Sequence, residues 1–441
     1  MIDYGEYKKS NFDWIGLVPR HWRVGAVKHC FKFKVGFTPP TSNDDFYDEE
    51  DGFDWVTISD MNTKYIYKSK NKISQKAVDL YSKEIVPIGS LLYSFKLSVG
   101  KVAFAGKDIF TNEAIFSILP SKDLELSYYY YCLPTILIHN ANENIYGAKI
   151  FNQEVIKNSR LPIPPKHEQV QISKYLDEKT SIIDGLITQK DELIQLLKAN
   201  RQSIINEVVI QGIHHNVRIK NSGIEWIETI PFNWNIVHIR YLVSKVGSGV
   251  TPKGGAEVYT EDGVPFIRSQ NVHFDGLRLD DIVNIDCETH ERMNGSKVMY
   301  KDVLLNITGA SIGRCCVVNI HNEMNVNQHV CIIRPNNRIT SEYLNLVLQS
   351  DIGQTQIKLG TTGGNREGLT FEAIKDFIIP LPELTEQREI VSKIESLLKK
   401  YGELEAKNSF QIEKLKEYRQ SLISEAVTGK IDLRNWQSSK N

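Results

Sequence analysis

The sequence predicts an α+β protein: two tandem globular domains of mixed α/β structure, separated by two long helices that form an antiparallel coiled coil with pseudo-two-fold symmetry. Three observations predict this fold. The start of the chain recurs half-way along it, a second pair of matching segments closes each half, and these closing segments have helical periodicity. The expected parts are the domains 1–160 and 214–378, the helix 161–213, and a second helix with a C-terminal tail, 379–441.

The internal repeat fixes this organisation. WIGLVPRHWRV, which begins at Trp14, recurs as WIETIPFNWNI, which begins at Trp226, and two tryptophans and a proline in each keep a spacing of 212 residues. Looser matches follow: Val35-Gly36 with Val246-Gly247, Thr38-Pro39 with Thr251-Pro252, and Ser98-Val99-Gly100-Lys101 with Ser311-Ile312-Gly313-Arg314. LPIPPKHEQVQISKYL from Leu161 matches IPLPELTEQREIVSKI from Ile379, and Glu168-Gln169 fall on Glu386-Gln387. The chain is therefore a tandem duplication.

The two closing segments predict long helices. Residues 166–210 contain no proline and a single glycine, and prolines precede both segments. Apolar residues recur mostly at spacings of three, four and seven, a heptad-like pattern: Ile172, Tyr175, Ile182, Leu186, Leu193, Leu197, Ile204 and Val208 in the first, and Ile390, Ile394, Leu397, Tyr401, Leu404, Ile412, Leu415, Tyr418 and Leu422 in the second. Gly212 and Gly429 mark the expected C-terminal ends. Each apolar stripe needs a partner, which we expect to be the other helix; packing of each helix on its own domain is the alternative.

Within the globular copies, matching segments predict strands and helices. Residues 54–61, 90–95, 265–272 and 302–308 have the pattern of buried strands that end in polar residues. Residues 127–140 and 341–351 predict helices, with Ser127 and Ser341 as candidate N-caps.

The strand ends carry side chains that suit DNA. Thr57-Ile58-Ser59-Asp60 and Arg268-Ser269-Gln270-Asn271 occupy matching positions but differ almost completely, although the residues around them agree. Arginine can pair with guanine, and asparagine or glutamine with adenine. Two units that read different base sequences would show this pattern, although solvent-exposed loops without function would also tolerate it.

Small residues and cations near these ends suit phosphate contacts. They lie in the stretches 146–149 and 360–366 and after the matched glycines of the repeat. The full set of candidate DNA-binding residues is Ser59, Asp60, Lys96, Ser98, Lys101, Lys149, Arg268, Ser269, Gln270, Asn271, Thr308, Ser311, Arg314, Thr361, Thr362, Asn365 and Arg366.

Composition limits the remaining classes of protein. Hydrophobic residues make up 41% and charged residues 24% of the 441 residues, and the formal net charge is −1, so DNA binding would need local patches or a partner that supplies charge. We see no secretory signal or membrane span, and read the six cysteines as reduced, as in a cytoplasmic protein. The sequence also lacks the P-loop, zinc-protease and nucleophile-elbow motifs and the Asn/Asp-Pro-Pro-aromatic run of an adenine methyltransferase. We therefore expect no catalytic or metal residues.

These motifs together resemble one family. The W-I-x-x-x-P-x-x-W start of both halves, the stretch Ser248-Gly249-x-Thr251-Pro252, and the P-L-P-x-x-x-E-Q stretch before the second long helix are similar to the specificity subunit of type I restriction–modification systems. The first copy departs from the pattern at Gly36-Phe37-Thr38-Pro39, which reads as shorter, and lacks the double glycine of the second copy.

The resemblance implies a DNA-reading subunit without catalytic activity of its own. Each globular copy would be a target recognition domain for one half of a split double-stranded DNA sequence. The long helices would set the gap and dock two methyltransferase subunits, which bring S-adenosylmethionine and methylate adenine at N6, and restriction/translocase subunits would add ATP- and Mg-dependent cleavage. Two alternatives remain at this point: a coiled-coil scaffold whose globular copies bind protein, and an enzyme with unrecognised chemistry.

Overall fold

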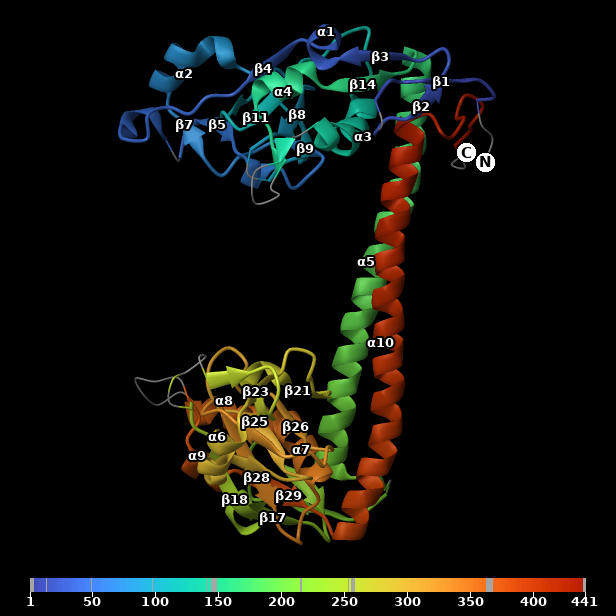
Figure 1. Ribbon diagram of the computed structural model, residues 1–441. Helices are drawn as coiled ribbons and strands as arrows, with labels where there is room; N and C mark the ends of the chain where they lie inside the picture. The colour runs from blue at the N-terminus through green and yellow to red at the C-terminus, as the bar shows by residue number, and fades with distance from the viewer. Residues whose placement is uncertain are drawn as a thin grey trace. The chain divides into compact units, whose positions relative to one another are not determined.

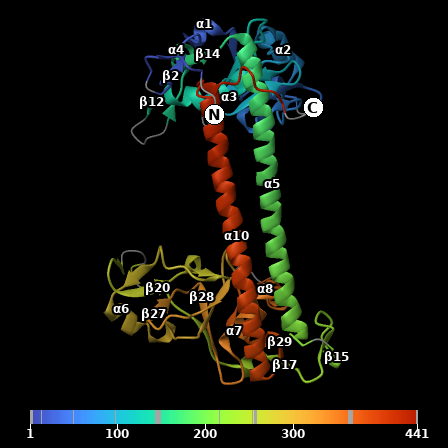
Figure 2. The ribbon, with the colours of Figure 1, turned by 90° about the vertical axis from the view of Figure 1, so that its right-hand side faces the viewer.

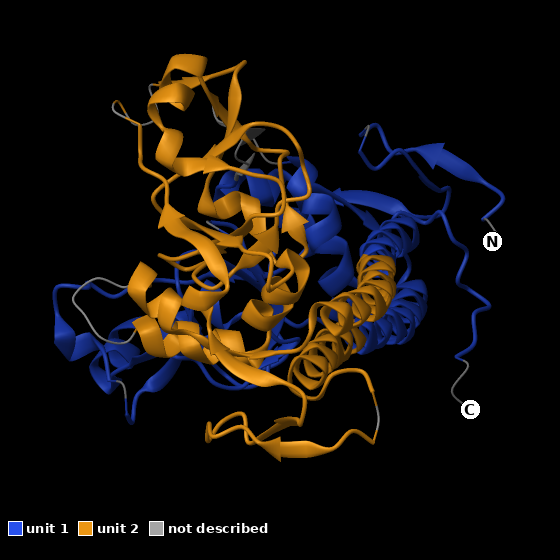
Figure 3. Cartoon of the chain, turned by 90° about the horizontal axis from the view of Figure 1, so that it is seen from below, with its two compact units in different colours: residues 1–190, 410–441 blue, residues 191–409 orange. Residues whose placement is uncertain are grey.

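The computed structural model describes residues 4–12, 14–48, 50–96, 98–140, 142–143, 149–214, 216–252, 254, 258–361 and 368–438. The chain divides into two compact units, residues 1–190 with 410–441 and residues 191–409 (Figure 3). Each unit contains one globular copy and about half of each long helix.

The first unit is built on a five-stranded sheet of order β4-β11-β8-β9-β6 and a three-stranded sheet of order β10-β5-β7. The strands are β1 Tyr7–Lys9, β2 Leu17–Pro19, β3 Arg23–Ala26, β4 Phe33–Val35, β5 Phe53–Val56, β6 Tyr65–Ile66, β7 Lys72–Ile73, β8 Leu91–Ser94, β9 Val102–Ala105, β10 Phe110–Thr111, β11 Ile115–Ile118, β12 Asn142–Glu143, β13 Lys149–Ile150 and β14 Arg160–Ile163. The helices are α1 Val27–Cys30, α2 Gln75–Tyr81, α3 Leu126–Ile136, α4 Gln153–Asn158 and α5 Lys166–Gln211, with the short 3-10 turns η1 Asp44–Phe46, η2 Ile58–Asp60, η3 Ser82–Glu84 and η4 Leu137–Asn140 (Figure 1).

The second unit repeats this plan with a four-stranded sheet of order β18-β28-β25-β26 and a five-stranded sheet of order β19-β23-β20-β27-β24. The strands are β15 Ile219–Asn221, β16 Thr229–Pro231, β17 Asn235–His238, β18 Val243–Ser248, β19 Tyr259–Thr260, β20 Val264–Ile267, β21 Val272–His273, β22 Gly276–Leu277, β23 Val283–Ile285, β24 Lys297–Val298, β25 Val303–Asn306, β26 Cys315–Val317, β27 Met324–Val326, β28 Val330–Pro335 and β29 Ile378–Leu381. The helices are α6 Cys287–Arg292, α7 Ser341–Gln349, α8 Asp351–Thr361, α9 Phe371–Asp376 and α10 Leu384–Val427, with 3-10 turns η5 Ile239–Tyr241, η7 Ser269–Asn271 and η8 Asn294–Ser296.

The central strands β8 and β25 are buried on both faces, which explains their uninterrupted apolar sequences. Leu91 and Tyr93 face the core that includes the long helices, whereas Leu92 faces a second, smaller core. In β25, Val303 and Leu305 face the helix side and Leu304 the other. The strand period of two therefore distributes each strand between two cores.

The first and last strands of each domain pair with one another. β3 pairs antiparallel with β14, and β17 pairs antiparallel with β29. Since β14 leads into α5 and β29 leads into α10, this pairing brings both ends of a domain to the start of a long helix.

The predicted pairing of the long helices is confirmed inside each unit, where α5 and α10 lie side by side (Figures 1 and 2). In the first unit, Arg419 Nε donates to Asp184 Oδ1 at 2.8 Å and Lys190 Nζ donates to Gln411 Oε1 at 2.6 Å. The residue number on α10 falls as the residue number on α5 rises, so the two helices are antiparallel. In the second unit, Asn200 Nδ2 donates to the Tyr401 hydroxyl at 2.7 Å. The alternative of helices packed separately is wrong.

Several local predictions need correction. The N-caps of α3 and α7 are Glu125 and Thr340, one or two residues before the serines that we predicted, because their side-chain oxygens accept the free helical N–H groups. The strands that we predicted over 54–61 and 265–272 end at Val56 and Ile267, and their polar ends are the 3-10 turns η2 and η7. On the helices, Ile182, Leu186 and Leu193 are exposed, because helix contact falls instead on neighbours such as Ile183 and Ile194.

The predicted match of Gly36 with Gly247 is also wrong. A Cβ on Gly36 would lie 2.1 Å from the Thr111 carbonyl oxygen, and one on Gly249 would lie 1.6 Å from the Val326 carbonyl oxygen. The structural counterpart of Gly36 is therefore Gly249, and the stretch from this glycine to the following Thr-Pro has the same length in both copies.

This close backbone approach gives a direct test. Gly249→Ala is expected to destabilise the second unit by about 3 kcal/mol, because the added methyl group meets backbone and no flexible side chain. Gly247→Ala is the matched control, since a Cβ there meets nothing within 4 Å. Urea denaturation of both variants measures the difference, and equal stabilities would contradict the proposed contact.

Candidate nucleic-acid interface

In the first unit, the structure brings together two stretches that contain predicted DNA-binding residues. Lys101 Nζ donates to Asn62 Oδ1 at 2.9 Å and to the Ile58 carbonyl oxygen at 3.4 Å. Ser94 Oγ, at the end of β8, accepts from the Lys101 amide at 2.9 Å. The turn after β8 and the η2 turn after β5 therefore form one surface, and Lys101 holds the two turns together.

The second unit joins the corresponding turns through a different residue. Asn306, at the end of β25, donates from Nδ2 to the Ser269 carbonyl oxygen at 2.8 Å and to Ser311 Oγ at 3.1 Å. Thr308 Oγ1 lies 2.5 Å from His329 Nδ1 on the same side. Sequence reasoning missed Asn306, Asn62 and His329. The one available signal was that Ser94 and Asn306 occupy matching positions at the ends of two predicted strands, and it would have indicated only the contacts of these two residues.

Two of the predicted contact residues hold the turns internally. Asp60 Oδ2 accepts from the amide and hydroxyl of Thr57 at 2.8 and 2.9 Å, and Asp60 Oδ1 accepts from the Lys70 amide at 3.0 Å. Asn271 is 2% exposed; its Oδ1 accepts from the Arg268 amide at 3.0 Å and its Nδ2 donates to the Arg278 carbonyl oxygen at 2.9 Å. These two side chains hold the turns in shape. A polar residue at the third position of the 3-10 turn, aspartate in η2 and asparagine in η7, therefore has the same structural role in both copies.

Arg268 is partly engaged with its own domain. Its Nη2 donates to the Asp281 carbonyl oxygen at 3.1 Å, and its guanidinium lies 5.9 Å from the centre of the Tyr259 ring. In the part of the chain that the structure describes, its buried Nε has no hydrogen-bond partner. A second acceptor would therefore be favourable at this position.

The other candidates fall into three groups. Ser59, Lys96, Ser98 and Gln270 are exposed, and Ser269, Thr308, Ser311, Arg314 and Thr361 are half-buried; Thr361 Oγ1 donates to the Lys358 carbonyl oxygen at 2.7 Å. Thr362, Asn365, Arg366 and the side chain of Lys149 lie outside the described residues. The exposed group contains the side chains that can reach a ligand without rearrangement.

Each domain is fixed to its long helix by the Glu-Gln pair that the repeat singles out. Glu168 is 2% exposed and its carboxylate accepts from Trp22 Nε1 at 2.9 Å, from the Tyr4 hydroxyl at 3.0 Å and from His21 Nε2 at 2.7 Å. Burial and this carboxylate raise the pKa of Tyr4 far above its ordinary value. In the second unit, Glu386 accepts from Trp234 Nε1 at 3.0 Å.

The glutamine of each pair bonds to a domain helix. Gln169 Oε1 accepts from the Glu125 amide at 3.0 Å, and Gln387 Oε1 accepts from the Thr340 amide at 2.8 Å. Glu125 and Thr340 are the N-caps of α3 and α7. The tryptophan and Glu-Gln motifs therefore fix the start of each long helix against the domain that carries the variable turns.

The comparison with known families decides the identity of this arrangement. The family described as "Type I restriction modification DNA specificity domain" matches residues 19–196 and 231–414, one match in each half of the chain. The chain belongs to this family.

Relatives with assigned names agree with this membership. The chain is 24% identical over 431 residues to the type I restriction enzyme EcoBI specificity subunit of Escherichia coli, covering 92% of this chain and 84% of the relative. It is 23% identical over 439 residues to the MjaIX specificity subunit of Methanocaldococcus jannaschii, covering 97% and 96%.

Two solved structures share the fold. One, from a study of complex assembly and conformational transition of the type I R-M system, has a TM-score of 0.72 at 16% identity and covers 94% of this chain and 99% of that chain. The HsdS subunit from Thermoanaerobacter tengcongensis has a TM-score of 0.50 at 17% identity, covering 94% and 98%.

Most of the cysteine side chains are buried. Burial raises the pKa of the Cys132, Cys316 and Cys331 thiols to about 12, so none of these three is a ready nucleophile. Among the described residues, no group of histidine, cysteine and carboxylate side chains has the arrangement of a metal site. None of the described helices combines the length and apolar character needed to span a bilayer.

Proposed function

We propose that this protein is the DNA-specificity subunit of a type I restriction–modification complex, that each globular domain reads one half of a bipartite duplex sequence, and that the chain itself catalyses nothing. The observation that carries the proposal is the contrast within the duplication. The contacts of Trp22, Glu168 and Gln169 recur at Trp234, Glu386 and Gln387, whereas the turns 57–60 and 268–271 differ in chemistry. Matching contacts beneath turns of different chemistry are expected of two domains that read different targets.

The long helices support the docking of partners. Leu186 and Tyr418 are 41% and 58% exposed and border a hollow of about 330 Å³ on the first unit's pair of helices. Phe410 and Leu196 are 59% and 66% exposed. A contiguous patch of exposed apolar side chains is typical of a protein interface, whereas single ones are common on any protein surface. We propose that two adenine-N6 methyltransferase subunits dock on the helices, and restriction/translocase subunits join through them.

The proposed assembly places the chemistry on these partners. S-adenosylmethionine would be bound by the methyltransferase subunits, and ATP and Mg by the restriction/translocase subunits, all in the cytoplasm. Because the chain has a net charge of −1, its partners would supply most of the charge that attracts the DNA phosphates.

The decisive experiment is to co-express the chain with its methyltransferase and map N6-methyladenine across a host genome. A single split motif with two specified halves is expected. Random methylation would overturn the proposal, and so would an unmethylated genome together with salt-insensitive or absent duplex binding by the complex. The last result would favour the alternative, a scaffold whose domains bind protein.

A single substitution tests the second turn. Gln270→Ala is expected to relax base preference at one position of one half-site by about 1–3 kcal/mol, because Gln270 is exposed at the tip of η7. Binding to a panel of duplexes with single base changes measures this. Arg268→Ala provides the comparison, since Arg268 is already bonded to its own domain; a uniform loss on all duplexes would identify a phosphate contact instead.

A further inference from the structure

The two units contain corresponding pockets that differ at one decisive position. In the first unit, Arg419 and Asp184 line a cavity of about 580 Å³ beside α3. In the second unit, Arg201 and Gly402 line a cavity of about 380 Å³ beside α7. Arg201 and Arg419 are 218 residues apart, as are Asp184 and Gly402, and this is the spacing that relates the two long helices. Gly402 therefore stands where the first unit has Asp184.

The first unit shows which group this arginine accepts. Arg419 donates from Nε to Asp184 Oδ1 at 2.8 Å and from Nη2 to Asp184 Oδ2 at 3.2 Å. This is a bidentate arginine–carboxylate pair, the geometry in which two parallel N–H groups match the two oxygens of a carboxylate.

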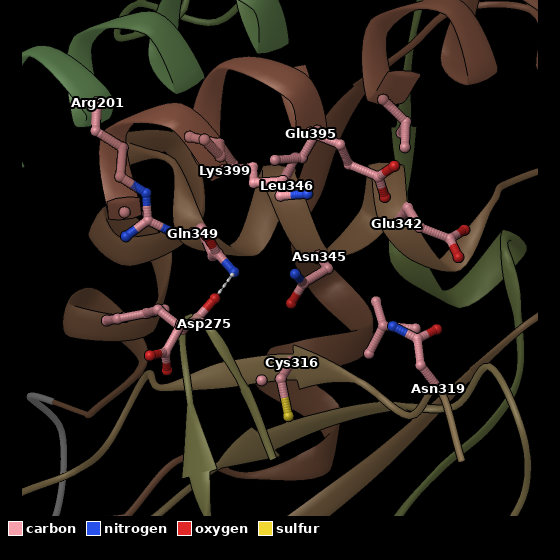
Figure 4. Close-up of a pocket in the computed structure, with 16 residues that line it drawn as sticks. Arg201, Asp275, Cys316, Asn319, Glu342, Asn345, Leu346, Gln349, Glu395 and Lys399 are labelled. Carbon is pink, nitrogen blue, oxygen red and sulfur yellow. Dashed lines mark hydrogen bonds between the residues drawn. The ribbon is translucent and has the colours of Figure 1, made fainter. Parts of the chain in front are cut away.

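The second unit leaves the equivalent arginine without that acceptor. Among the described residues, the buried Nε of Arg201 has no hydrogen-bond partner. The side chain points into the cavity toward Gln349 (Figure 4). A buried guanidinium N–H without an acceptor costs free energy, which a bound carboxylate would recover.

A second unsatisfied atom faces the same space. Asn345 Oδ1 is buried and has no donor within the described structure. Asn345 lies on α7 below Arg201 in the close-up, and both side chains line the cavity (Figure 4). The lining also carries Lys399 and three carboxylates. Glu342 and Asp275 are paired with Lys301 and Arg278, and Glu395 offsets the positive charge of Lys399.

We propose that this cavity in the second unit, lined by Arg201, Asn345 and Gly402, binds a ligand that combines a carboxylate with an N–H donor, as an amino acid does. The carboxylate takes the place of the missing Asp184 counterpart on the Arg201 guanidinium, and the donor bonds to Asn345 Oδ1. The volume of about 380 Å³ lies within the range of small-ligand sites. The proposal does not depend on DNA reading.

The chain offers its own blocking variant. Gly402→Asp introduces the carboxylate that the first unit already has, and a Cβ at Gly402 meets nothing within 4 Å. Gly402→Asn is the matched control, because it has nearly the same shape without the charge. We would measure binding of sodium glutamate and sodium acetate to the full chain by calorimetry, and the thermal unfolding midpoint with each salt against sodium chloride at equal ionic strength.

The expected result is saturable binding of glutamate, weaker binding of acetate, and a rise in unfolding midpoint of about 2–4 °C at saturating glutamate. Gly402→Asp should weaken glutamate binding at least about tenfold and raise the midpoint without ligand, whereas Gly402→Asn should retain binding. Arg201→Met should abolish glutamate binding. Equal binding by wild type and Gly402→Asp, or no effect of either carboxylate beyond that of chloride, would overturn the proposal.

A last measurement identifies the source of the carboxylate. If the docked methyltransferase inserts an aspartate or glutamate side chain, the complex should no longer bind free glutamate; if the ligand is a free acid, the complex should bind it as the chain alone does. The site would be contradicted if the complex lost glutamate binding while Gly402→Asp left glutamate binding by the free chain unchanged.

Discussion

Exchange of residues 1–160 for the corresponding domain of another member of the specificity family is expected to change one half of the methylated DNA motif and leave the other half intact. The physical reason is that each domain has its own cores and its own turns, and each is anchored separately through Glu168 or Glu386. One mismatched base pair typically costs about 1–3 kcal/mol, so a half-site that differs at three positions should lose at least about 100-fold in preference.

The design of this exchange follows from the anchor. The incoming domain must keep donors equivalent to Tyr4, His21 and Trp22, because the Glu168 carboxylate remains in the recipient helix. Genome-wide mapping of methyladenine gives both half-sites in one measurement. The exchange of residues 214–378 is the reciprocal control and should change only the other half. An altered sequence in both halves after either exchange would contradict separate reading.

Glu168→Ala is expected to cost the first unit about 3–5 kcal/mol of unfolding free energy. The substitution removes an acceptor that is 2% exposed and leaves the N–H of the fully buried Trp22 and the hydroxyl of Tyr4 without a partner. Urea denaturation monitored by tryptophan fluorescence measures the loss, with Trp22 as one of the six tryptophans that contribute to the signal.

Two variants separate the lost carboxylate from a general packing defect. Glu168→Gln keeps one acceptor oxygen in nearly the same volume and should lose less than half as much. Glu386→Ala removes an acceptor whose contacts are the 3.0 Å bond from Trp234 and a 3.4 Å bond from Asn233, so its effect should be smaller and confined to the second unit. If Glu168→Ala and Glu386→Ala had equal small effects, the carboxylate would not be the anchor of the domain.

Much of the fold could be predicted because duplication repeats its signals. Prolines before Lys166 and Leu384 and glycines after Gln211 and Val427 bracket both long helices, and Gly212 and Gly429 have the left-handed φ of 73° that such helix ends favour. The paired motifs around Trp22 and Trp234 also marked the residues that the structure places under the helix starts. These are local or repeated patterns, and a single sequence records them.

The candidate DNA interface was less predictable, because a side chain's partner depends on neighbours that are distant in sequence. Asp60 and Asn271 have the chemistry of DNA contacts, but the turns use them as internal acceptors. Asn306 attracted no attention in the sequence, yet it joins two turns that are separated by about forty residues. The periodicity of α5 also could not distinguish Ile182 from Ile183, although Ile183 is buried and Ile182 is exposed.

The duplication, the two long helices and the family could be recognised without coordinates, because repeated spacing and helical periodicity are properties of the chain alone. Which polar side chains remain free to bind a ligand, and which already bond within the protein, became clear from the folded chain. That distinction arises because hydrogen bonds form between groups that folding brings together: Arg419 and Arg201 look alike in the sequence, and only the packed helices show that one has its carboxylate and the other does not.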